Sequence, residues 1–163
     1  MTQIKNEPDP GRVMTWWSRL SALPAGAWLF SRALGFLAPY SATIGARVEE
    51  IRPGYARVSF SDRRRVRNHL RSIHAIALVN LGEIATGLAV LSTISSGMRA
   101  ILVDIRAEYL KKARGRLIAT AEFALPDALA DNTSCEVEAC LTDADGETVT
   151  RVRATWLVGY KKQ

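Results

Sequence analysis

The sequence has few residues of the kinds that build disulfide scaffolds or metal centres. It contains only two cysteines and two histidines in 163 residues. Cys135 and Cys140 are five positions apart, so in a strand their side chains point to opposite faces and cannot easily bridge. We therefore interpret both as reduced thiols that fill the core. His69 and His74 match no metal-ligand spacing, and we expect no metal.

The sequence also lacks a membrane-spanning run and a secretory signal. Its longest apolar stretch, residues 74–98, is interrupted by Asn80, Glu83 and several Ser and Thr residues, whereas a spanning helix needs about 20 predominantly apolar residues. The N-terminal residues MTQIKNEPDPGR are polar and contain acids and prolines, unlike a signal peptide. We therefore expect a cytoplasmic protein without a transmembrane segment.

The chain does contain enough apolar material for one core, because 48% of its residues are hydrophobic. No internal repeat or low-complexity segment divides it. We expect a disordered arm over residues 1–11 and one domain over residues 12–163. The formal charge of 22 − 16 = +6 leaves nucleic acid, an anionic membrane surface and a ligand with several phosphates as partner classes.

The stretch HAIALVNLGEIATGLAVLSTISSGM, residues 74–98, predicts a long helix that is apolar around nearly its whole circumference. Such a helix must be wrapped by other elements. Glu83 is its only formal charge, and a lone buried carboxylate is costly unless it is paired or used.

The flanking sequence supplies a helical cap and six strands. Residues 12–40 carry apolar side chains at helical spacing on both sides of Pro24 and end near Pro39, which predicts two short helices. Period-two alternation begins at Ala42 and predicts two strands before the long helix and four after it. We therefore predict an α+β fold in which an antiparallel sheet of about six strands wraps around the long helix.

Asn68, His74 and Glu83 carry a family resemblance. Their spacing, 74 − 68 = 6 and 83 − 74 = 9, is similar to that of phenylacetate-degradation-type acyl-CoA thioesterases of the hotdog fold. In that family an Asn precedes a His-Gly-Gly that opens the central helix, and an acidic residue follows. The strand order resembles the same fold over roughly residues 42–161, with the cap outside it. Ala75 and Ile76 replace the two glycines.

The resemblance implies hydrolysis of an acyl-CoA thioester. Backbone N–H groups around Ala75 and Ile76, at the positive end of the helix dipole, would form an oxyanion hole. Glu83 would be the general base or nucleophile, and Asn68 would orient water or the substrate carbonyl. Two alternatives stay open: Glu83 is paired with an Arg or bonded across a dimer without catalysis, and His74 is a helix-start residue held by loop groups.

Helix geometry predicts that His74 and Glu83 do not meet within one chain. Nine residues separate them by about 180° around the axis and about 13.5 Å along it. A site that uses both the helix start and Glu83 therefore needs a second subunit, and a C2 dimer supplies two equivalent sites. We expect a homodimer or a dimer of dimers.

Two basic clusters flank the predicted site. Arg forks and Lys charges suit the pyrophosphate and 3′-phosphate of coenzyme A, although either cluster can instead be a solvated face. Neither has interleaved aromatics or a known nucleic-acid motif, so we expect no nucleic-acid partner, and no cofactor apart from the coenzyme A of the substrate. The predicted coenzyme-binding residues are Arg64, Arg65, Arg67 and Arg71 before the helix, and Lys111, Lys112 and Arg114 in a later turn that resembles the family's coenzyme-contacting turn.

Two other functions compete with thioester hydrolysis. A non-catalytic acyl or acyl-CoA binding protein can use the same scaffold, because replacing both glycines could close the oxyanion hole. A basic protein could also dock its Trp-rich cap on an anionic membrane.

Overall fold

The computed structural model describes residues 11–130 and 132–161. The predicted disordered arm lies outside these residues except for Gly11, which is buried. The order of two helices, two strands, one long helix and four strands is as predicted. The elements are α1 (Arg12–Ser21), α2 (Gly26–Leu37), the short 3₁₀ helix η1 (Ser41–Ile44), β1 (Arg47–Arg52), β2 (Tyr55–Ser61), the 3₁₀ helix η2 (Arg64–Val66), α3 (Ala75–Leu91), β3 (Met98–Tyr109), β4 (Arg116–Glu122), β5 (Thr133–Thr142) and β6 (Thr148–Tyr160).

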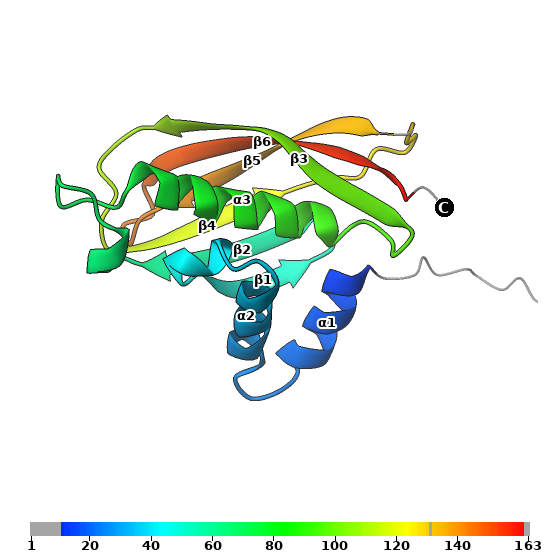
Figure 1. Ribbon diagram of the computed structural model, residues 1–163, viewed down its shortest axis with the longest axis horizontal. Coiled ribbons are helices and arrows are strands. Elements are labelled where there is room, and N and C mark those ends of the chain that lie inside the picture. Colours follow the sequence, from blue (N-terminus) through cyan, green and yellow to red (C-terminus); the bar gives the residue numbers. More distant parts are fainter. Residues whose placement is uncertain (1–10, 131, 162–163) are drawn as a thin grey trace, which may run out of the picture.

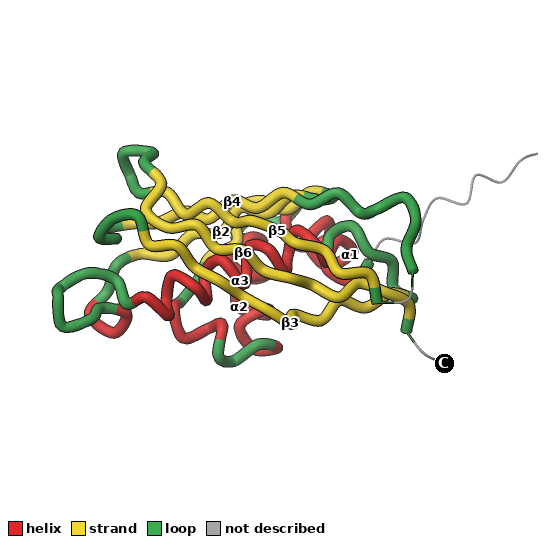
Figure 2. Tube along the Cα trace, turned by 90° about the horizontal axis from the view of Figure 1, so that it is seen from above, coloured by secondary structure: helices red, strands yellow, loops and turns green. Residues whose placement is uncertain are grey.

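The strands form one antiparallel sheet in the order β1-β2-β4-β5-β6-β3. The sheet curls around α3, and the cap helices α1 and α2 lie beside it, on the side of β1 (Figure 1). Seen from above, the strands run alongside α3 (Figure 2). The predicted α+β fold, with a six-stranded sheet wrapped around a long helix, is confirmed.

The sheet and α3 approach each other closely at Gly82. Leu81, Ala85 and Ala89 are fully buried. A Cβ atom placed on Gly82 would lie 2.5 to 2.7 Å from the side chain of Val152 on β6, a distance that real side chains do not tolerate. A side chain at position 82 would therefore push α3 off the sheet.

The prediction that the long helix continues to Met98 is wrong, because α3 ends at Leu91. The hydroxyl of Ser92 donates to the Ala89 carbonyl at 2.7 Å, and that of Thr93 donates to the Val90 carbonyl at 2.8 Å. Short hydroxyl side chains that bond to nearby backbone carbonyls favour helix ends over helix interiors. Met98 instead begins β3.

The first strand also begins later than predicted. Residues from Ser41 to Ile44 form η1, and Gly45 follows with a φ of 64°. This left-handed backbone turns the chain at a cost that glycine alone avoids. The strand therefore starts at Arg47 and not at Ala42.

The two edges of the sheet differ in how far other elements cover them. The β1 edge is covered by the cap, since the Val48 amide donates to the Ser31 hydroxyl of α2 at 2.9 Å. The β3 edge carries Ile101 and Val103 with 47% and 52% of their surface exposed. An uncovered edge strand with apolar side chains is a template for pairing with another strand.

Both cysteines are free, as predicted, but the prediction that both fill the core is wrong for Cys140, which lies outside the core cluster. Cys135 is buried and Cys140 is half-buried, on opposite faces of β5. Burial raises the pKa of both thiols.

Candidate functional site

The start of α3 is capped by its own histidine. The Nδ1 atom of His74 accepts a hydrogen bond from the Ile76 amide at 3.1 Å, and the His74 carbonyl accepts from the Ala77 amide at 2.9 Å. The Ile76 amide is therefore occupied in this structure. The Ala75 amide donates to no residue in the described part of the chain, so it is the open donor at this helix terminus.

Asn68 holds the loop that leads into α3. Its Oδ1 atom accepts from the Leu70 amide at 2.9 Å and from both the amide and the hydroxyl of Ser72 at 3.2 Å. The side-chain oxygen is thus used for the turn, and only the amide nitrogen is left to meet a ligand. Arg71, in the same turn, has a φ of 56°.

Backbone hydrogen bonds bring the two predicted basic clusters together. The Ile73 amide donates to the Ala113 carbonyl at 2.9 Å, and the Asp62 amide donates to the Gly115 carbonyl at 2.9 Å. These bonds tie the loop before α3 to the turn between β3 and β4. The sequence predicted this proximity only through the family resemblance.

The basic residues divide into paired and unpaired ones. Arg67 is bound to Asp62 at 2.7 Å, and Lys111 is bound to Asp143 at 2.7 Å and to Glu147. These ion pairs hold the pKa of both cations above its ordinary value. The remaining five predicted coenzyme-binding residues form no ion pair within the described residues: Arg64, Arg65, Arg71, Lys112 and Arg114.

A pocket of about 360 Å³ opens beside the helix start. His74, Ile76 and Asn80 of the α3 region line one side, and Tyr40 and the η1 segment line the other. Arg65 is also part of the lining, so one unpaired cation faces the pocket.

Asn80 is a candidate site residue that the sequence-based reasoning missed. It is 3% exposed, its Nδ2 atom donates weakly to the Tyr40 carbonyl at 3.4 Å, and its Oδ1 atom has no partner within the described residues. A buried polar atom without a partner is costly and points to strain or function. The available signal was a lone amide on an otherwise apolar helix, three residues before Glu83.

Glu83 lies in a second, smaller pocket of about 120 Å³. Its carboxylate has no hydrogen bond or ion pair with the rest of the described chain, so pairing with an Arg of the same chain does not occur. Burial raises the pKa of this carboxyl above its ordinary value. The pocket is mostly apolar, with Leu34, Ala38, Ser41, Ile84, Gly87, Leu88, Leu91 and Trp156 around the acid.

The two pockets follow one another along α3 beneath the same part of the cap. Ile76, Asn80, Glu83 and Gly87 recur at helical spacing on one stripe of the helix, and the α2–η1 segment walls both pockets. The cap therefore lines an apolar pocket, as predicted. Glu83 and the helix start remain separated along the axis.

Tyr109 is a second residue that the predicted site did not include. Its hydroxyl donates to the Ala75 carbonyl at 3.4 Å, which places the end of β3 against the helix start. Burial raises the pKa of this phenol.

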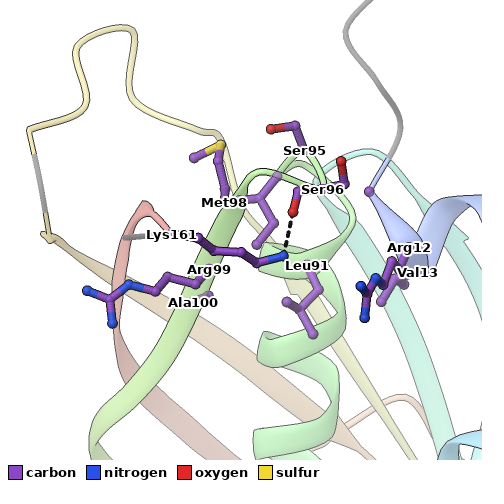
Figure 3. Close-up of a pocket in the computed structure, with 11 residues that line it drawn as sticks. Arg12, Val13, Leu91, Ser95, Ser96, Met98, Arg99, Ala100 and Lys161 are labelled. Atoms are coloured by element: carbon purple, nitrogen blue, oxygen red, sulfur yellow. Dashed lines mark hydrogen bonds between the residues drawn. The ribbon is translucent and has the colours of Figure 1, made fainter. Parts of the chain in front are cut away.

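A third pocket lies at the opposite end of α3 (Figure 3). Its volume is about 240 Å³, and Arg12, Leu91 and Lys161 are among its lining residues. The ammonium group of Lys161 is already bonded to the Ser96 carbonyl. This pocket is remote from Ala75 and contains none of the predicted site residues.

The described residues contain no group of three side chains that could hold a metal ion. Within the same residues, every helix is too short or too polar to cross a membrane.

A family model described as "Domain of unknown function (DUF4442)" matches residues 26–158. The match spans most of the chain, including α2, α3, strands β1 to β5 and most of β6. The chain belongs to this family. Among curated proteins, none matches it.

Solved structures show which fold this DUF4442 chain shares with known proteins. The structural-genomics protein APC5556 is 35% identical, with a TM-score of 0.78 over 91% of this chain and 98% of its own. PA5026 from Pseudomonas aeruginosa, a protein of unknown function and probable thioesterase, is 22% identical, with a TM-score of 0.70 over 85% of this chain and 97% of its own. The thioesterase HI1161 from Haemophilus influenzae is 18% identical, with a TM-score of 0.66 over 78% of this chain and 88% of its own.

This DUF4442 chain therefore has the hotdog fold of the thioesterase-like proteins, as the sequence resemblance implied. Identities of 18% and 22% establish the fold and leave the chemistry to be argued from the residues of this chain.

Proposed function

We propose that this protein hydrolyses acyl-CoA thioesters with Glu83 as the general base or nucleophile. The observation that carries the proposal is an unpaired carboxylate held in an apolar pocket, with a pKa raised by burial. A carboxylate whose pKa is shifted toward neutrality is suited to accept a proton from water. A carboxylate with only a structural role would be expected to have a partner.

The electrophilic half of the site is the start of α3. The Ala75 amide is open, and the positive end of the helix dipole favours the negative charge that develops on a thioester carbonyl oxygen. Ala75 and Glu83 are eight residues apart, which is about 12 Å along the axis. Both groups must lie about 3 Å from the reacting atoms, so one helix cannot supply both.

A second subunit resolves this separation. The β3 edge has exposed Ile101 and Val103, whereas the β1 edge is covered by α2. This asymmetry favours association through β3, which borders α3. We infer a C2 dimer in which Glu83 of one subunit and the Ala75 amide of the other lie at the same site, which gives two equivalent sites.

The unpaired cations provide the coenzyme contacts in this proposal. Arg64, Arg65 and Arg71 precede the helix start, and Lys112 and Arg114 lie in the adjoining turn. Their charges are free to meet the phosphates of coenzyme A.

The proposal is tested by release of free thiol from a panel of acyl-CoA esters of increasing chain length, with the protein at concentrations above and below its dimer dissociation constant. Turnover that falls together with the dimer fraction supports a shared site. Full activity of a monomer measured by sedimentation would contradict the shared site.

The rival is an acyl-CoA binding protein without turnover, and one observation favours it. The Ile76 amide is occupied by His74, so a two-amide oxyanion hole is not open in this structure. Native mass spectrometry of gently purified protein separates the two functions. A retained, intact acyl-CoA that stays unhydrolysed for hours would favour the binding protein.

A further inference from the structure

The cap has a surface that the proposed hydrolysis does not use. Seven of the fourteen exposed large apolar side chains in the described residues lie on it, although the cap is a small part of the chain. Phe36 and Leu37 are 85% and 67% exposed. The seven are Trp16, Leu23, Trp28, Leu29, Phe36, Leu37 and Tyr40, of which Tyr40 alone also lines the pocket beside the helix start.

The charges of this surface are of one sign. From Gly11 to Val48 the sequence contains no Asp or Glu, whereas it contains four arginines. Arg12, Arg19 and Arg32 of the cap are exposed and form no ion pair with any described residue. Within the described residues, the acids that neutralise arginines elsewhere, such as Glu49 and Asp62, lie after the cap in the sequence.

The apolar and basic residues alternate along each helix. On α1, Arg12, Trp16 and Arg19 recur at spacings of four and three, which places them on one face. On α2, Trp28, Arg32 and Phe36 recur every four residues. Helices that lie in a lipid interface typically combine arginines with exposed tryptophans and leucines.

The shape of the cap presents these residues outward. Trp17 of α1 packs edge-on against Phe30 of α2, with ring centroids 5.2 Å apart, so the two helices form one unit. Their connecting turn points away from the sheet (Figure 1). Leu23 in that turn is 52% exposed, and Trp28 in the first turns of α2 is 49% exposed.

We propose that the cap docks on the surface of an anionic phospholipid bilayer, with Leu23, Trp28 and Leu29 entering the interface and the arginines contacting lipid phosphates. A second copy of the chain is a poorer occupant. A two-fold contact through this face would oppose arginine to arginine, with no acid on either cap to neutralise them. The negative headgroups of a bilayer supply the missing charge.

Vesicle flotation tests this proposal independently of catalysis. Full-length protein is mixed with vesicles of phosphatidylcholine alone or of phosphatidylcholine with phosphatidylglycerol. We expect flotation with the anionic vesicles only, weakened by added salt. Leu23→Ser with Trp28→Ser should abolish it. Arg19→Gln with Arg32→Gln should lower the partition coefficient by about 10-fold or more, because each basic residue near an anionic surface strengthens binding several-fold.

Matched variants remove the same kinds of residue elsewhere. Arg52→Gln with Arg106→Gln removes two exposed positive charges from strands, and Leu110→Ser with Tyr160→Ser removes two exposed apolar side chains. Both should float like the wild type. Equal losses in the control and cap variants, or no flotation of the wild type, would overturn the proposal. Self-association abolished by the Leu23/Trp28 change, without vesicle binding, would assign the face to a second copy.

Discussion

The Nδ1 atom of His74 accepts a hydrogen bond from the Ile76 amide at 3.1 Å, so the imidazole and the second amide of the helix start satisfy each other. The residue that matches the family's motif histidine thus acts as the helix N-cap. In the proposed mechanism, an incoming carbonyl oxygen would meet the Ala75 amide directly and would reach the Ile76 amide only if His74 turned away.

Replacing His74 should therefore change the stability of the protein. We expect His74→Ala to lower the free energy of unfolding by about 0.5–2 kcal/mol, the usual cost of losing an N-cap. His74→Asn should retain most of this free energy because its side-chain oxygen can accept the same amide hydrogen. Urea unfolding at neutral pH measures both. Equal stability of the Ala and wild-type proteins would show that the cap contributes nothing.

Asn80 should show a trade-off between stability and function. Leu has a similar size and removes the buried, unpartnered Oδ1 atom, so we expect Asn80→Leu to leave the melting temperature unchanged or to raise it. If the amide contacts the bound acyl thioester, kcat/KM should fall by about 10-fold or more, equivalent to the 1–3 kcal/mol of a buried hydrogen-bonding group. Lower stability with unchanged turnover would make Asn80 a purely structural residue.

Glu83 should make the stability depend on pH. Burial raises the pKa of Glu83 in the folded state, so between its unfolded and folded pKa values the folded protein binds more protons than the unfolded one. Stability from this group therefore falls as pH rises through that interval. Glu83→Gln should be more stable than the wild type above the interval, and the difference should vanish at pH values below the ordinary glutamate pKa of 4.5. Urea midpoints of both proteins across acidic pH measure the difference, and a constant difference would contradict the raised pKa.

The unpaired cations should affect binding of the coenzyme more than the chemical step. We expect Arg64→Ala with Arg65→Ala, or Lys112→Ala with Arg114→Ala, to raise KM for acyl-CoA and to leave kcat nearly unchanged. Lys111→Ala is the matched control in the same turn, because Lys111 is already bound to Asp143 and Glu147. Steady-state kinetics with acyl-CoA and with a short thioester that lacks the nucleotide separate the contributions. A similar KM effect with both substrates would remove the cations from coenzyme recognition.

The central helix could be predicted from the sequence because a long apolar stretch with a single charge, Glu83, is typical of a helix that other elements surround. Its end could not, because Ile94 and Met98 beyond it are also buried and continue the apolar pattern. The Ser92 and Thr93 hydroxyls bond to nearby backbone carbonyls where α3 ends. The hydrophobic pattern of the sequence carries no information about these bonds.

The residues of the candidate site could be predicted in part. The resemblance to the thioesterase motif points to Asn68, His74 and Glu83, and the structure places Glu83 in an apolar pocket. The occupied Ile76 amide, the orphaned oxygen of Asn80 and the ion pair between Lys111 and Asp143 depend on three-dimensional contacts. Such contacts join residues that no spacing rule connects.

The most direct test of the proposed function is the rate of thiol release by wild type and Glu83→Gln, each shown to bind acyl-CoA equally. We predict that kcat falls by at least about 100-fold in the variant, the lower end of general-base effects, while binding of acyl-CoA persists. Equal turnover by the two proteins would remove Glu83 from the mechanism. Absence of turnover in both, with binding retained, would contradict hydrolysis itself.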